Sequence, residues 1–163
     1  MKRVLKNKKG FTLVELLAVI VVLAIIILIA VPSVMNSMEK ARRNSFVVEA
    51  REIIKSAQAA YAEYLMNSSS GSGSTVCISY AALKSAGFIE KNDSTYKGSV
   101  KIEAKAGGES VYTIWLSNRA YIITGKTASG LKNEDATQSG DNNASENCNG
   151  MANVLTASAI GGQ

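Results

Sequence analysis

The 163-residue sequence contains no histidine. This absence excludes catalytic triads built on imidazole, histidine metal sites, and histidine as a general acid or base. The two cysteines, Cys77 and Cys148, are too few to complete a zinc site by themselves. We therefore expect no catalytic residues, no metal ion and no cofactor, and we expect that the protein is not an enzyme.

Acidic side chains are missing from the first ten residues. These residues carry five of the 18 lysines and arginines, namely Lys2, Arg3, Lys6, Lys8 and Lys9. The rest of the chain holds 13 basic and 13 acidic side chains, so the net charge of +5 belongs to this short tag. Because such tags usually direct targeting or membrane topology, we infer no specific nucleic-acid partner.

Charge is almost absent from residues 11–31, where Glu15 is the single ionisable side chain. As a helix this segment would be about 31 Å long, close to a hydrocarbon core of roughly 30 Å. The basic tag predicts a cytoplasmic N-terminus and an outer location for the residues after Pro32. A cleaved secretory signal fits poorly, because its apolar core is shorter and ends at a small-x-small site. A plain signal anchor is the remaining alternative, but it gives no reason for Glu15.

A carboxylate within a spanning helix costs about 2.5–3.5 kcal/mol at the helix centre and normally has a partner. The positive end of the helix dipole is one explanation for Glu15. Cleavage between Gly10 and Phe11 is another, because it would create an α-amino cation four residues before Glu15. The two charges would then share a helix face and would pair within one chain or between neighbouring chains.

The segment KGFTLVELLAVIVVLAIIILIAVPSV resembles the N-terminal signature of type IV prepilins and the related pseudopilins. The match is close over residues 6–35 and general in character to about residue 66. The resemblance implies that Gly10 is the last leader residue and that Phe11 becomes the N-methylated first residue of the mature chain. It also implies that Glu15 directs assembly by pairing with the Phe11 amine of an adjacent subunit. Pro32 would mark a kink in the helix.

After the apolar run, residues 33–66 show the i, i+3, i+4 recurrence of an amphipathic helix, with apolar positions from Phe46 to Leu65. We predict one helix over residues 11–66, about 84 Å long. Its first part, 11–31, would span a membrane or form a filament core, and its second part, 32–66, would be amphipathic. Residues 1–10 would be a basic leader peptide, and residues 67–163 a globular head.

The head is predicted to be a small antiparallel β-sheet packed on the amphipathic helix, which gives a pilin-like α+β fold. Residues 68–75 are expected to form a flexible linker, and a short helix is expected to stop at Gly87. Three β-rich runs follow at residues 95–104, 109–117 and 120–126 and predict an antiparallel meander. In the second run, either the odd-numbered or the even-numbered residues of 111–116 should face the helix.

Polar composition predicts disorder for residues 128–150, although Cys148 lies among them. Cys77 and Cys148 both fall on the predicted outer side, where oxidation is feasible. A bond between them would close a loop of about 70 residues, worth about 4 kcal/mol in the chain-entropy model. The resemblance favours this bond, because many pilins close a C-terminal loop with a disulfide, and two free thiols are the alternative. Residues 141–146 fail the EF-hand pattern, so we expect a solvated loop there instead of a calcium site.

The sequence therefore predicts a structural subunit of a type IV pilus, made as a membrane precursor and polymerised into an extracellular helical filament. Its partners would be further copies of itself, a prepilin peptidase and N-methyltransferase, the pilus assembly machinery, and the membrane before assembly. One alternative is a pseudopilin of a type II secretion or competence system. Another is a membrane-anchored binding module with no role in assembly.

Overall fold

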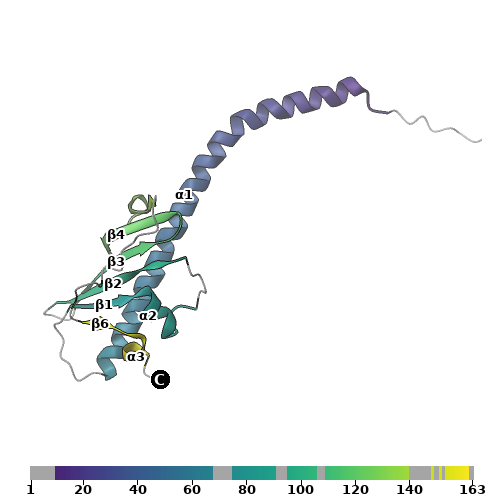
Figure 1. Ribbon diagram of the computed structural model, residues 1–163. Coiled ribbons are helices and arrows are strands. Elements are labelled where there is room, and N and C mark those ends of the chain that lie inside the picture. Colours follow the sequence, from purple (N-terminus) through teal and green to yellow (C-terminus); the bar gives the residue numbers. More distant parts are fainter. Residues whose placement is uncertain are drawn as a thin grey trace, which may run out of the picture. The chain divides into compact units, whose positions relative to one another are not determined.

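The computed structural model describes residues 10–67, 75–90, 95–105, 109–139, 148, 151 and 153–161 (Figure 1). The chain divides into two compact units, Met1–Lys40 and Ala41–Gln163, and the first helix contributes to both. The elements are α1 (Leu13–Asn67), β1 (Thr75–Ser79), α2 (Tyr80–Ser85), β2 (Lys97–Ala104), β3 (Ser110–Ser117), β4 (Tyr121–Thr127), the 3-10 turn η1 (Asn133–Asp135), β5 (Thr137–Gln138), β6 (Val154–Leu155) and α3 (Ala157–Ile160). A long apolar helix followed by a small sheet confirms the predicted α+β, pilin-like fold class.

Helix α1 contains 55 residues, and its bounds agree with the predicted helix over residues 11–66. Buried side chains occur only in its part within the second unit, where they recur every three or four residues. They are Phe46, Val47, Ala50, Ile53, Ile54, Ala57, Ala60 and Tyr61. This spacing makes a single apolar stripe along α1, which can pack on a sheet while the opposite side stays in solvent.

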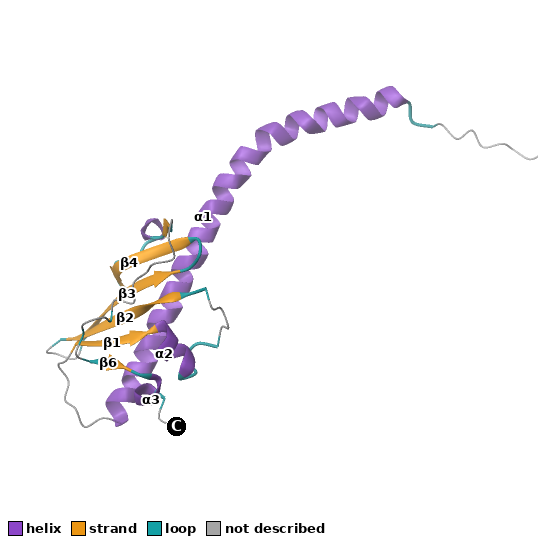
Figure 2. Cartoon of the chain, in the orientation of Figure 1, coloured by secondary structure: helices purple, strands orange, loops and turns teal. Residues whose placement is uncertain are grey.

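The sheet has six described strands in the order β5-β4-β3-β2-β1-β6 (Figure 2). The predicted meander is present, because β2, β3 and β4 pair antiparallel in succession. Strand β1 pairs antiparallel with β2, and β6 pairs parallel with β1. The parallel pair makes the sheet mixed, whereas the sequence predicted antiparallel pairing only.

The core of the second unit lies between α1 and one face of this sheet. In β3 the even-numbered side chains face α1, since Ile114 and Leu116 are buried with the α1 stripe and Tyr112 packs against it. At one end of the core, the ring of Phe46 lies 5.8 Å from the ring of Tyr121, measured between centroids. These contacts identify the head-facing side of α1 and leave its outer side exposed.

Two turns show how local chemistry sets the ends of the elements. Ser79 caps α2, because its hydroxyl accepts a hydrogen bond from the amide of Ala82 at 3.1 Å. The helix ends at Ser85, and Gly87, which the sequence predicted as the stop, follows two residues later with a φ of +83° that favours glycine. Between β3 and β4, the side-chain oxygen of Asn118 accepts from the amides of Ala120 and Tyr121 at 2.9 and 2.7 Å.

The segment after β4 is ordered where the composition predicted disorder. Leu131 and Ala136 are buried in the core, and η1 and β5 lie in the same segment. The prediction of disorder is therefore wrong for residues 128–139, because two apolar side chains anchor an otherwise polar stretch. Most of the remainder of that prediction, residues 140–147, lies outside the described residues.

Candidate functional site

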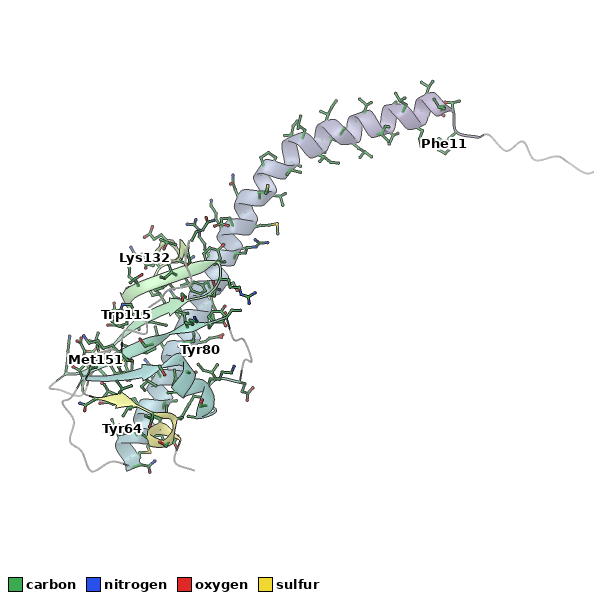
Figure 3. All side chains as sticks on the ribbon, viewed as in Figure 1. Phe11, Tyr64, Tyr80, Trp115, Lys132 and Met151 are labelled. Atoms are coloured by element: carbon green, nitrogen blue, oxygen red, sulfur yellow. A yellow bond between two sulfur atoms is a disulfide. The ribbon has the colours of Figure 1, made fainter. Side chains whose placement is uncertain are left out.

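The first unit presents an apolar helix with no protein around it. Every described large hydrophobic side chain from Phe11 to Val31 is exposed, with Phe11 at 90% and Leu13 at 79% (Figure 3). Among the described residues, α1 is the one helix long and apolar enough to cross a membrane. An exposed apolar surface of this extent requires either lipid or protein partners.

Thr12 and Glu15 are held together at the start of α1. Glu15 Oε2 accepts hydrogen bonds from the Thr12 amide and the Thr12 hydroxyl, each at 3.0 Å. In return, the Thr12 hydroxyl oxygen accepts from the Glu15 amide at 3.4 Å. This reciprocal arrangement is a capping box, which satisfies two amides that the helix itself leaves without acceptors. In lipid, where water cannot serve those amides, the capping box gives the carboxylate a structural role of its own.

Gly10 and Phe11 precede this capped helix in a non-helical stretch, and both are exposed. A Cβ atom built on Gly10 meets no atom within 4 Å. The chain's own fold therefore does not require glycine at position 10. A requirement for glycine there would have to come from a molecule that acts on this peptide bond.

Residues 5–31 match the family model of the prokaryotic N-terminal methylation motif. The chain carries a type IV pilin signal. With the apolar helix, this motif supports a pilin-like or pseudopilin precursor that a prepilin peptidase processes and that assembles at a membrane. No curated protein and no solved structure matches the chain.

Pro32 of this pilin-like precursor lies inside α1, and residues on both sides of it are helical. Proline has no amide hydrogen, so the carbonyl of Leu28, four residues earlier, loses its usual helical donor. The kink at Pro32 stays a prediction.

In the second unit, Cys77 and Cys148 form a disulfide, with their Cα atoms 5.7 Å apart. Cys77 lies on β1 and is fully buried, and its amide donates to the Asn153 carbonyl at 3.0 Å. The bond thus joins β1 to the segment that leads into β6. The disulfide therefore belongs to the head of the precursor and does not involve the signal residues at the start of α1.

The described ranges contain no group of three or more histidine, cysteine, aspartate or glutamate side chains that could hold a metal ion. The weak calcium alternative, residues 141–146, lies outside the described residues. The described part of the precursor therefore presents no donor set around which metal chemistry could be argued.

The capping role of Thr12 is the part of this site that the sequence analysis did not identify. The pattern T-L-V-E at residues 12–15 is a capping-box signature and was available in the sequence. The length and apolarity of the run instead predicted a lipid environment, in which the charge of Glu15 is costly. Of the predicted residues, Gly10, Phe11 and Glu15 lie together at the start of α1 with Thr12, whereas Cys77 and Cys148 lie in the second unit.

Proposed function

We propose that the chain is the precursor of a structural subunit of a type IV pilus. A prepilin peptidase cleaves it after Gly10 and the new N-terminus on Phe11 is methylated. The mature chain stays in the membrane through the first half of α1 and then polymerises into an extracellular helical filament. In the filament, other copies of the same apolar segment replace lipid around it.

The observation that carries this proposal is the exposed apolar start of α1 within the matched methylation motif. A lipid environment covers such a surface in the precursor. Side-by-side packing of identical helices would cover it equally well in a filament. The capping box would serve a plain membrane anchor as well, but a plain anchor has no use for the charge of Glu15, whereas a polymer needs a group that sets the position of one helix against the next.

Glu15 supplies that group in the proposed mechanism. Its Oε2 atom accepts both hydrogen bonds from Thr12, which leaves the Oε1 atom for a donor from another subunit. After cleavage, the Phe11 amine of an adjacent subunit pairs with Glu15, which fixes the offset between the two helices. Such a pair is strong in a filament core because few water molecules compete with it.

Mass spectrometry of the N-terminal peptide tests the proposal in two fractions, filaments sheared from intact cells and washed membranes. We expect N-methylated Phe11 in the sheared fraction. If processed Phe11 occurs in membranes only, a pseudopilin of a secretion or competence system replaces the pilus subunit. An intact Met1 in both fractions would refute processing and favour the anchored binding module.

Substitutions at Glu15 separate the capping role from the pairing role. Glu15→Gln keeps a hydrogen-bonding side chain for the capping box but removes the charge, whereas Glu15→Ala removes both. Because removing one partner of a buried pair costs about 3–5 kcal/mol, we expect both variants to lose sheared filaments by far more than tenfold. Thr12→Val, which keeps the carboxylate, should assemble better than either.

The control is equal membrane insertion and equal cleavage after Gly10 in all variants. If Glu15→Gln assembles like the unsubstituted chain, then capping suffices and the pairing mechanism is wrong.

A further inference from the structure

The outer face of α1 in the second unit is bordered by two grooves of opposite charge. At about 100° per residue, Glu49, Glu52 and Ser56 follow one edge of the buried stripe of α1. Arg51 and Lys55 follow the other edge. Each row of side chains forms the inner wall of a shallow groove between α1 and a different loop of the head.

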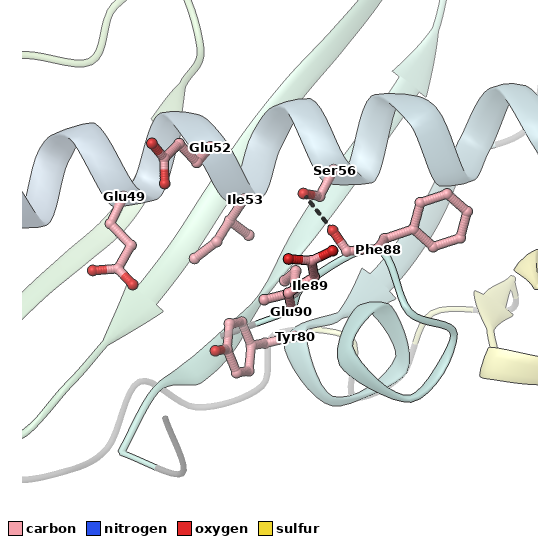
Figure 4. A pocket seen from close by; sticks show the side chains of 8 residues that line it. All are labelled: Glu49, Glu52, Ile53, Ser56, Tyr80, Phe88, Ile89 and Glu90. Atoms are coloured by element: carbon pink, nitrogen blue, oxygen red, sulfur yellow. Dashed lines mark hydrogen bonds between the residues drawn. The ribbon is translucent and has the colours of Figure 1, made fainter. Parts of the chain in front are cut away.

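The acidic groove lies between α1 and the residues that follow α2 (Figure 4). Its cavity measures about 270 Å³, and its lining includes the carboxylates of Glu49, Glu52 and Glu90. No lysine or arginine occurs among its described lining residues. The hydroxyl of Ser56 donates to the Phe88 carbonyl at 3.0 Å, which holds the outer wall against α1. Glu49 accepts a hydrogen bond from the Tyr96 hydroxyl, whereas Glu52 and Glu90 are exposed. The groove therefore has a defined shape and an acidic lining.

The basic groove lies on the opposite edge of α1, beside the turn that follows β4. Its cavity measures about 350 Å³, and its described lining contains Arg51, Lys55, Gln58 and Ser129 but no acidic residue. Arg51 Nη2 donates to the Leu131 carbonyl at 2.8 Å, which holds the guanidinium group on this edge. This groove is the electrostatic complement of the acidic one.

The α1 surface between the two grooves carries short side chains that project little from the helix. Val48 is 49% exposed, and Ala59 and Ala62 are exposed small side chains. Two copies with parallel α1 helices can therefore approach side by side, so that the acidic edge of one meets the basic edge of the other. Two different patches in contact make a heterologous interface, which repeats without closing and builds a helical assembly. A two-fold dimer through either edge would bring like charges together.

We infer that neighbouring copies of this chain dock through these two edges of α1, acidic groove against basic groove. The inference rests on the proposed function, and it adds a second copy-to-copy contact to the one made by the apolar segment. Each head has one acidic edge and one basic edge, so successive copies would dock in the same rotational sense around the filament axis.

Charge reversal at two exposed positions tests the contact in the full-length chain. Glu90→Lys reverses one of the three described charges that line the acidic groove, and Lys55→Glu reverses one of the two that line the basic groove. We expect each single variant to lower the yield of sheared filaments about tenfold or more, because like charges then face each other. The chain that carries both substitutions exchanges one charge between its two edges, so the lysine at position 90 can again face an acidic side chain at position 55 of a neighbour, and it should recover most of the yield.

Glu103→Lys is the matched control, since it reverses a partly exposed charge on β2, on the face of the sheet opposite to the buried side chains of Val100 and Ile102 that pack towards α1. It should assemble normally, and every variant should show equal insertion and cleavage. Normal filament yield from both single reversals would overturn the inference, as would failure of the combined variant to recover. In either case filaments from the unsubstituted chain would leave the proposed function standing.

Cysteine crosslinking on whole cells gives a second readout, whether or not filaments reach the surface. Glu90→Cys combined with Lys55→Cys should give a ladder of covalent oligomers after oxidation, because a heterologous contact propagates from copy to copy. Chains that carry only one of the two introduced cysteines, beside the native pair Cys77 and Cys148, should give none. Dimers from a chain with one introduced cysteine, or no ladder from the combined chain, would overturn the inference. A ladder together with an intact Met1 would instead refute the processing step of the proposed function.

Discussion

Loss of the disulfide between Cys77 and Cys148 is expected to destabilise the head strongly. The two residues are 71 positions apart in the sequence. In the chain-entropy model, opening a loop of this size stabilises the unfolded state by about 4 kcal/mol at 25 °C. For a unit the size of Ala41–Gln163, this corresponds to a fall in the thermal midpoint of about 15 °C.

The assay is thermal and urea unfolding of the full-length chain in detergent, with and without a reducing agent. Reduction breaks the bond but keeps both sulfur atoms, so it isolates the bond from the packing of the buried Cys77 side chain. The double Cys77→Ala, Cys148→Ala variant should unfold at the same temperature or lower, since it also removes packing. The dependence of stability on urea should become steeper, because the open chain exposes more surface when it unfolds.

Equal midpoints for the oxidised and reduced chains would refute the reasoning. That outcome would mean that the segment from Cys148 to β6 is held by its strand pairing and apolar contacts alone, or that the unfolded chain is already compact. A midpoint that falls while the urea dependence stays constant would assign the loss to the folded state.

Two further substitutions test the head fold by equilibrium unfolding. Gly98→Ala should lower stability by at least about 2 kcal/mol, because its Cβ would lie 2.1 Å from the carbonyl oxygen of Trp115; an unchanged midpoint would contradict the close approach of β2 and β3. Lys126 Nζ lies 2.6 Å from Asp135, and this hydrogen bond, with a second from the Lys132 amide, lowers the pKa of Asp135. The resulting stability is present above the usual carboxyl pKa and is lost as pH falls through the lowered pKa. Asp135→Asn should therefore be less stable than the parent at pH 7, with a difference that disappears in acid; a constant difference at all pH values would contradict this cause.

The main elements could be predicted from the sequence because their patterns are long. The apolar run and the recurrence from Phe46 onward define α1 over many turns, and each strand of the meander has at least seven residues. Strand β1 was missed, because Thr75–Ser79 is only five residues long and runs directly into α2. Strand β6 has two residues and pairs with a strand far away in the sequence, so no local pattern indicates it.

The residues of the candidate site also fall into those that a sequence pattern indicated and those that only the fold brings together. Gly10, Phe11 and Glu15 belong to a long ordered motif and were found from it, and Thr12 was readable from its spacing to Glu15. The two charged edges of α1 were not predicted. Their charges lie in the amphipathic pattern, but their outer walls come from loops whose positions depend on the fold of the whole head.

The bond to Cys148 and the pairing of β6 with β1 also set the order of events during synthesis. At about 5–20 residues per second, Cys148 is made about 4–14 s after Cys77. During this interval β1 has an open edge, and the side chains of Leu155 and Ile160, buried in the finished core, do not yet exist. Until the last elements arrive, the nascent head therefore presents the Cys77 thiol and an unpaired edge of β1 side by side, and an open strand edge is a site where another chain can pair.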